Sequence, residues 1–158
     1  MRMRLGFRTL LRLNLVSVGL GLSFSAAAAY TDADIRSAAR QWGVDGFLKK
    51  VASAAAASLP LQPDAYTEIT TVLAIGNSIN YTGRLVQLTA EEARAAGLDQ
   101  IRSQIREAGT PRVCSSPIAQ ILITEFGARY TYTFFSKDHH RLFKYQIEKA
   151  DCLPYVRK

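Results

Sequence analysis

Two stretches near the C-terminus of this 158-residue chain alternate between apolar and polar side chains at almost every step. They cover residues 128–135 and 141–149, and the apolar side chains that alternate with polar ones are Tyr130, Tyr132, Phe134, Phe143, Tyr145 and Ile147. Successive side chains of a strand point to opposite faces of a sheet, so each stretch predicts a strand with one aromatic and one polar face. Residues 136–139 predict the turn between them. Such a hairpin is typical of an antiparallel sheet that is covered on one face.

The polar side of these two strands is a candidate surface for binding another protein. Its side chains are Arg129, Thr131, Thr133, Lys144, Gln146 and Glu148. Charges of both signs are mixed there, which suits a protein partner better than a polyanion. An ordinary solvated sheet face is the alternative interpretation. The aromatic side is interpreted as core, and a small-molecule pocket among those rings is the lesser alternative.

A second hairpin is predicted earlier in the chain, over residues 66–87. From residue 66 to residue 75 the composition changes to Thr, Ile, Val and Tyr, as in strands. Side chains that fall on one side of a period-two pattern there are Ile69, Thr71, Leu73 and Ile75. The turn signal Gly76-Asn77-Ser78 follows, and the next stretch places Ile79, Tyr81 and Leu85 on one face.

Helix signals occupy the remaining segments. An N-cap at Thr31 begins a helix that continues to about residue 58, with a break or bend expected at Gly43 and Gly46. A capping box at residues 89–92 begins a helix that should stop at 109–111. Ser116 followed by proline begins a third, which ends at Gly127. The sequence thus predicts an α+β fold, an antiparallel sheet of two hairpins packed on one face by helices, in the order α-β-β-α-α-β-β.

The first 29 residues have the organisation of a cleavable secretion signal. Arginines precede an apolar block at 13–24, and a run of small residues follows at 25–29. Cleavage after Ala27, Ala28 or Ala29 is equally consistent with that run. An uncleaved anchor is an alternative, although the apolar block is shorter than the roughly 20 residues that a membrane span needs. An organellar transit peptide is another, although such peptides are amphipathic.

Removal of this signal changes the charge of the chain. Four arginines leave with it, so Lys plus Arg falls from 20 to 16 against 13 acidic residues, and the net charge falls from +7 to +3. The remaining basic residues are scattered among acids, without the basic stripe that phosphate backbones require. Nucleic acid is therefore not an expected partner, and a membrane is expected to be contacted only through an uncleaved signal.

The rest of the chain, residues 30–158, has the size of one domain. Its two cysteines, Cys114 and Cys152, form an even pair in a chain expected to enter an oxidising compartment, which favours one disulfide. Two free thiols are the alternative. A zinc site is not expected, because neither cysteine has a second cysteine or a histidine at ligand spacing.

Signals for catalysis are weak. The histidines His139 and His140 are adjacent, and neighbouring strand residues point to opposite faces, so a metal or acid–base role is not favoured. Carboxylates that a fold could bring together are Asp64, Glu68, Glu125 and Glu148. No nucleophile elbow, phosphate-binding loop or calcium loop is present. No cofactor is predicted, and a small hydrolase or ligand-binding enzyme with a non-local site is kept as the alternative function.

Several short motifs resemble those of small, poorly characterised bacterial exported proteins that share a leader peptide, an α+β body and a cysteine pair in the last third. The residues that carry the resemblance are Leu59-Pro60-Leu61, Asp64, Thr67, Tyr81, Val113-Cys114-Ser115, Pro117, Gly127, Tyr130, Tyr132 and Asp151-Cys152. The resemblance implies a periplasmic or secreted location and the disulfide, and it implies no activity. Independently of the resemblance, a compact sheet with one disulfide and no convergent polar chemistry fits an exported protein that binds an envelope protein as adaptor, inhibitor or assembly factor, and this is the function we expect.

Overall fold

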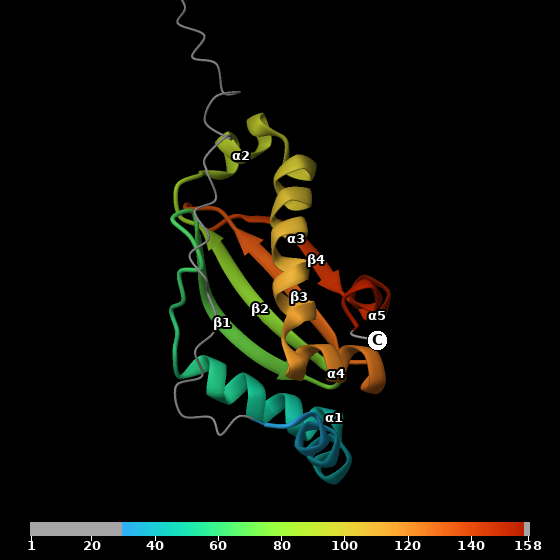
Figure 1. Ribbon diagram of the computed structural model, residues 1–158. Coiled ribbons are helices and arrows are strands. Elements are labelled where there is room, and N and C mark those ends of the chain that lie inside the picture. Colours follow the sequence, from blue (N-terminus) through green and yellow to red (C-terminus); the bar gives the residue numbers. More distant parts are fainter. Residues whose placement is uncertain (1–29, 157–158) are drawn as a thin grey trace, which may run out of the picture.

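The computed structural model describes residues 30–156, and the predicted signal at 1–29 lies outside the described residues. Four strands form one sheet in the order β1-β2-β3-β4 (Figure 1). They are β1 (Thr67–Ile75), β2 (Ser78–Leu85), β3 (Arg129–Phe135) and β4 (Arg141–Ile147). Antiparallel pairing joins β1 to β2 and β3 to β4. Both predicted hairpins are confirmed.

The sheet is mixed, because β2 and β3 run parallel to each other at its centre. A parallel pair needs a crossover connection of a dozen or more residues. Here the segment between β2 and β3 contains three helices, which carry the chain back to the start of β3. They are α2 (Ala90–Ala96), α3 (Leu98–Ser115) and α4 (Pro117–Phe126). The prediction of an antiparallel sheet is therefore confirmed within each hairpin. It is wrong where the two hairpins meet, because β2 and β3 are parallel.

Helices cover one face of the sheet, as predicted. They are α1 (Asp32–Ala56), α2 (Ala90–Ala96), α3 (Leu98–Ser115), α4 (Pro117–Phe126), the short α5 (Lys149–Cys152) and a 3-10 turn, η1 (Leu153–Tyr155). In Figure 1, α3 passes in front of the sheet and α1 runs along its lower end. None of the helices described has the length and apolar character required to cross a membrane.

The N-terminal helix α1 is bent where its sequence predicts a bend. At its start, the Thr31 hydroxyl accepts from the Asp34 amide at 3.2 Å, and the Asp34 carboxylate accepts from the Thr31 amide at 2.9 Å. This reciprocal pair is a capping box. Gly43 has φ 69° and ψ 162° inside the helix, a backbone conformation that is essentially restricted to glycine. The kink lets both halves of α1 bury side chains.

The capping box predicted at residues 89–92 is confirmed, but the helix that follows differs from the prediction. Gly97, with φ 94°, divides it into α2 and α3. Moreover, α3 continues through Pro111 to Ser115 instead of stopping at 109–111. Its last turn contains Cys114, which is fully buried and bonded to Cys152. Tertiary packing therefore outweighs the local stop signal, as it commonly does for helix propensity.

A β-bulge in β1 changes which side chains share a face. The register shifts between Ile69 and Thr71, and an extra residue in one strand reverses the alternation that follows it. Ile69 therefore packs against the core, whereas Leu73 and Ile75 are 56% and 67% exposed. The predicted grouping of these three residues on one side is wrong for this reason.

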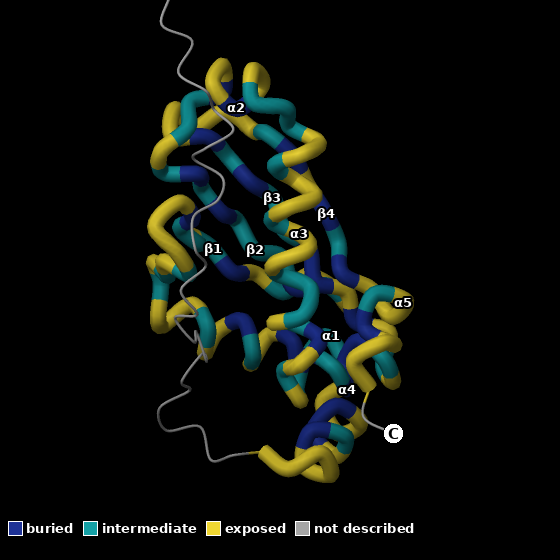
Figure 2. Tube along the Cα trace, turned by 45° about the horizontal axis from the view of Figure 1, so that its top comes forward, coloured by how far each residue is buried: buried dark blue, intermediate teal, exposed yellow. Residues whose placement is uncertain are grey.

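The hydrophobic core lies between the sheet and α1, α3 and α4. Its fully buried aliphatic side chains are Ile35, Leu48, Ile79, Leu122, Ile123 and Ile147. Figure 2 shows these buried stretches on the sheet and the inner sides of the helices, with exposed stretches outside. The sheet is packed so closely that a Cβ atom at Gly83 would lie 2.5 Å from the ring of Phe134.

The predicted disulfide is confirmed. Cys114, at the end of α3, is bonded to Cys152 in α5, 38 residues later, and both are fully buried. Nearby, the Arg106 guanidinium contacts the Asp151 carboxylate at 2.7 Å. These two links hold α5, which follows the last strand, against α3.

Candidate binding surface

The face of the sheet that points away from the helices is the candidate binding surface, called the open face below. The strand register arranges its side chains in rows that cross all four strands. We define the open face by ten residues in β1 to β4, namely Thr71, Leu73, Ile75, Ser78, Asn80, Thr82, Thr131, Thr133, Lys144 and Gln146. It combines hydroxyl, amide and ammonium groups with two aliphatic side chains at one corner.

A buried threonine lies at the centre of the open face. Thr131 is only 2% exposed. Its hydroxyl accepts a hydrogen bond from the Gln146 amide at 3.1 Å and lies 3.3 Å from the hydroxyl of Ser78. Because these bonds fix three neighbouring side chains, the middle of the open face is preorganised for contact with a partner.

The structure brings together most of the residues predicted for a partner surface. Thr131, Thr133, Lys144 and Gln146 belong to the open face. Arg129 stands at its margin, in register with Ser78, and donates to the side-chain oxygen of Asn77 at 3.0 Å. Glu148 lies beyond the sheet, as the N-cap of α5. Their role in binding a partner stays a prediction.

Sequence analysis missed the contribution of the first hairpin to this surface. Leu73 and Ile75 are exposed there, and the half-buried Arg84 forms an ion pair with Glu68 across β1 and β2. Strand order brings both hairpins into one sheet, and no local signal encodes that order. The repeated Tyr-Thr pairs in β2 and β3 could have suggested it, since Tyr81 and Tyr132 are register partners.

The opposite, helix-facing side of the sheet carries a row of stacked tyrosines. The ring centroids of Tyr81 and Tyr132 are 4.9 Å apart, and those of Tyr132 and Tyr145 are 5.0 Å apart. Burial raises the pKa of Tyr81 to about 12 and raises that of Tyr132 well above its ordinary value. These phenols are therefore neutral at physiological pH, and the row acts as core packing, as predicted.

The carboxylates considered for catalysis each have their own structural partner, and the histidines lie in an exposed turn. Glu125 forms a bidentate pair with Arg36, and Glu68 pairs with Arg84. Asp64 accepts hydrogen bonds from the backbone amides of residues 66 and 67. His139 and His140 are exposed in the β3–β4 turn. Within residues 30–156, no group of three or more His, Cys, Asp or Glu side chains could hold a metal ion.

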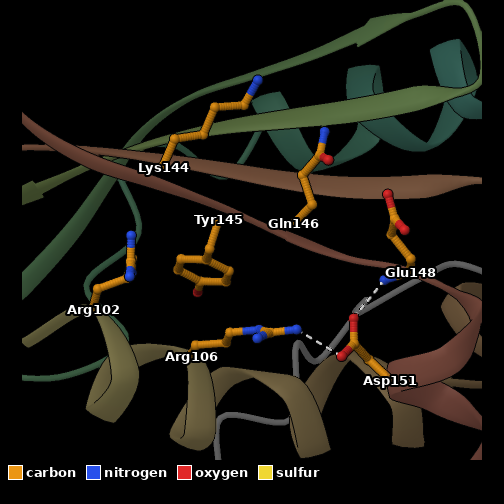
Figure 3. A pocket seen from close by; sticks show the side chains of 7 residues that line it. All are labelled: Arg102, Arg106, Lys144, Tyr145, Gln146, Glu148 and Asp151. Carbon is orange, nitrogen blue, oxygen red and sulfur yellow. Dashed lines mark hydrogen bonds and ion pairs between the residues drawn. The ribbon is translucent and has the colours of Figure 1, made fainter. Parts of the chain in front are cut away.

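A polar pocket of about 380 Å³ lies where the outer edge of β4 faces α3 and α5. Arg102 and Arg106 extend from α3, and the ring of Tyr145 points toward them from β4 (Figure 3). Lys144 and Gln146 leave β4 on the other side. The acidic lining residues Glu148 and Asp151 lie toward the opposite end from Arg102 and Lys144.

Comparison with known proteins identifies solved structures that have a similar fold. No protein-family model matches the sequence, and a search among curated proteins found no match. Among solved structures, one similar chain is a Pseudomonas aeruginosa protein assigned as secreted, with a TM-score of 0.55 and 22% identity. The match covers 69% of this chain and 92% of that one.

Two further structures are pilotins of type II secretion systems. One is EpsS from Vibrio vulnificus, with a TM-score of 0.56 and 13% identity over 73% of this chain and 94% of that chain. The other is AspS from Vibrio cholerae, with a TM-score of 0.54 and 15% identity over 73% and 98% of the two chains. At these identities the likeness establishes a shared fold.

Proposed function

We propose that this protein is an exported binding protein that holds another protein of the cell envelope against the open face of its sheet. The open face itself is the observation that carries the proposal. In the part of the chain that the structure describes, helices cover only the other side, and Leu73 and Ile75 stay more than half exposed beside hydroxyl, amide and ammonium groups. Apolar and polar groups side by side are the usual composition of a protein–protein interface.

The location in the proposal rests on three observations. The disulfide fits a compartment outside the cytoplasm, because such bonds persist where the environment is oxidising. The first 29 residues have the organisation of a secretion signal. The fold is shared with a protein assigned as secreted and with two pilotins. A component of a type II secretion system is therefore the first class of partner to test.

The experiment compares capture by the wild-type protein with capture by two variants of equal charge. The tagged full chain is expressed in its own cells, and envelope proteins that purify with it are quantified by mass spectrometry. Thr133→Glu alters the open face, where the new carboxylate would face its register partner Lys144. Ser37→Glu makes the same change at an exposed site on α1.

We expect Thr133→Glu to reduce the captured partner at least about tenfold, because the new carboxylate compensates the Lys144 ammonium and would lose its water in the interface. Ser37→Glu should capture as much partner as the wild type does. Equal capture by both variants would show that the open face is not the interface. Absence of any captured envelope protein would contradict the proposed function itself.

A further inference from the structure

We infer that the polar pocket between β4 and α3 receives an extended, acidic segment of the partner protein, which adds alongside the edge of β4. This inference deepens the proposed function and rests on it for the identity of the partner. It concerns a second contact, next to the open face, and it assigns the chemistry of the segment that binds there.

The first argument comes from the edge of the sheet. β4 is the last strand in the order, and it pairs with β3 on one side only. Half of the backbone amides and carbonyls of an edge strand point outward, where they can pair with another chain. The segment of β4 that lines the pocket, residues 144–146, therefore offers backbone hydrogen bonds to an extended peptide, as in β-strand addition.

The second argument comes from the charges that flank this edge. Arg102 and Arg106 lie on the helix side of β4, and the Lys144 side chain leaves on the opposite side (Figure 3). Successive side chains of an added strand would point alternately to those two sides. Two consecutive acidic residues in the segment would therefore meet a guanidinium on one side and an ammonium on the other.

The third argument concerns the balance of positive and negative charge along the pocket. Asp151 already pairs with Arg106 at 2.7 Å, so that guanidinium is largely compensated. Within residues 30–156, Arg102 pairs only with the exposed Asp99, three residues before it, and surface pairs of this kind contribute little. Together with Lys144, Arg102 gives one end of the pocket excess positive charge. Charge complementarity selects an acidic segment there.

The test uses two synthetic peptides with blocked ends and opposite charge. One has the sequence Thr-Val-Glu-Glu-Val-Thr, and the other carries lysines in place of the two glutamates. Each is titrated into the isotope-labelled exported protein, purified from the envelope fraction after expression of the full chain. Amide chemical shifts report where the peptide binds. The charge-reversed variant Arg102→Glu/Lys144→Glu is compared with Arg112→Glu/Lys137→Glu, which makes the same change at exposed sites outside the pocket.

We expect the glutamate peptide to shift the amide signals of residues 143–148, and the lysine peptide to leave them unchanged. Charge reversal in the pocket should weaken binding at least about tenfold, whereas the control variant should bind as the wild type does. Shifts elsewhere, equal binding of the two peptides, or no binding of either would overturn the inference. Because capture through Thr133 is measured separately, the pocket can fail while the proposed function stands, and the reverse.

Discussion

At the scale of single residues, the clearest long-range link is the pair between Arg36 in α1 and Glu125 in α4. The Arg36 Nε and one terminal nitrogen donate to the two carboxylate oxygens of Glu125 at 2.8 and 2.7 Å. These hydrogen bonds lower the pKa of Glu125. A carboxylate with a lowered pKa stabilises the fold above its ordinary pKa and loses that contribution as the pH falls through the folded-state value.

Arg36→Gln should therefore raise the pKa of Glu125 toward its ordinary value, because the hydrogen bonds from Arg36 are lost. The variant should be less stable than the wild type at neutral pH, and the difference should disappear in strong acid, where Glu125 is protonated in both. Carbon-detected NMR titration of the carboxyl group and urea unfolding at each pH measure the two effects. An unchanged Glu125 pKa in the variant would show that the pair does not persist in solution. Arg112→Gln is the control, and it should leave the Glu125 pKa unchanged.

At the scale of elements, the kink in α1 determines how that helix fits the core. Buried residues on both sides of the kink, such as Ile35 before it and Leu48 after it, reach the same core. The kink depends on the backbone conformation of Gly43, which has a positive φ of 69°. A Cβ atom at this position would meet nothing within 4 Å. Any cost of substitution is therefore conformational rather than steric.

Gly43→Ala should lower the free energy of unfolding by about 1 to 3 kcal/mol, the usual cost of a non-glycine residue in such a conformation. Ser53→Ala, at an exposed position of the same helix, should change it by less than about 0.5 kcal/mol. Denaturant unfolding measures both variants. Equal stability of Gly43→Ala and the wild type would mean that α1 straightens without loss of packing.

Elements that depend on local signals could be predicted, and those that depend on distant contacts could not. Capping by Thr31, the stop at Gly127 and both hairpins follow from side chains close in sequence. The bulge near Thr71 interrupts the alternation of β1 without a local signal. The passage of α3 through Pro111 brings Cys114 to its distant partner Cys152. Four of the predicted partner residues share a face because strand alternation is local, namely Thr131, Thr133, Lys144 and Gln146.

At the scale of the whole molecule, the disulfide closes a loop that contains α4, β3 and β4. Closing a loop of this length restricts the unfolded chain and should stabilise the fold by roughly 3 to 4 kcal/mol. Cys114→Ala/Cys152→Ala should lose about that amount of unfolding free energy. The reductant control is direct, since dithiothreitol should destabilise the wild type similarly and leave the double variant unaffected. A stability difference near zero would contradict the structural role of the bond.

The whole molecule also explains why the candidate site was only partly visible in the sequence. The polar side of the second hairpin could be recognised from its alternation alone. The open face becomes four strands wide only because β2 pairs with β3, and the charged pocket forms only because α3 crosses near the edge of β4. Both features arise from the crossover connection, which local patterns do not specify.

The central claim, that the open face holds an envelope protein, is tested most directly by photo-crosslinking in living cells. A photoreactive amino acid is placed at Leu73 on the open face or at Arg40 on α1, both of them exposed positions. We predict that irradiation links an envelope protein to the Leu73 position and not to the Arg40 position. No adduct at Leu73, or the same adduct from both positions, would contradict the account.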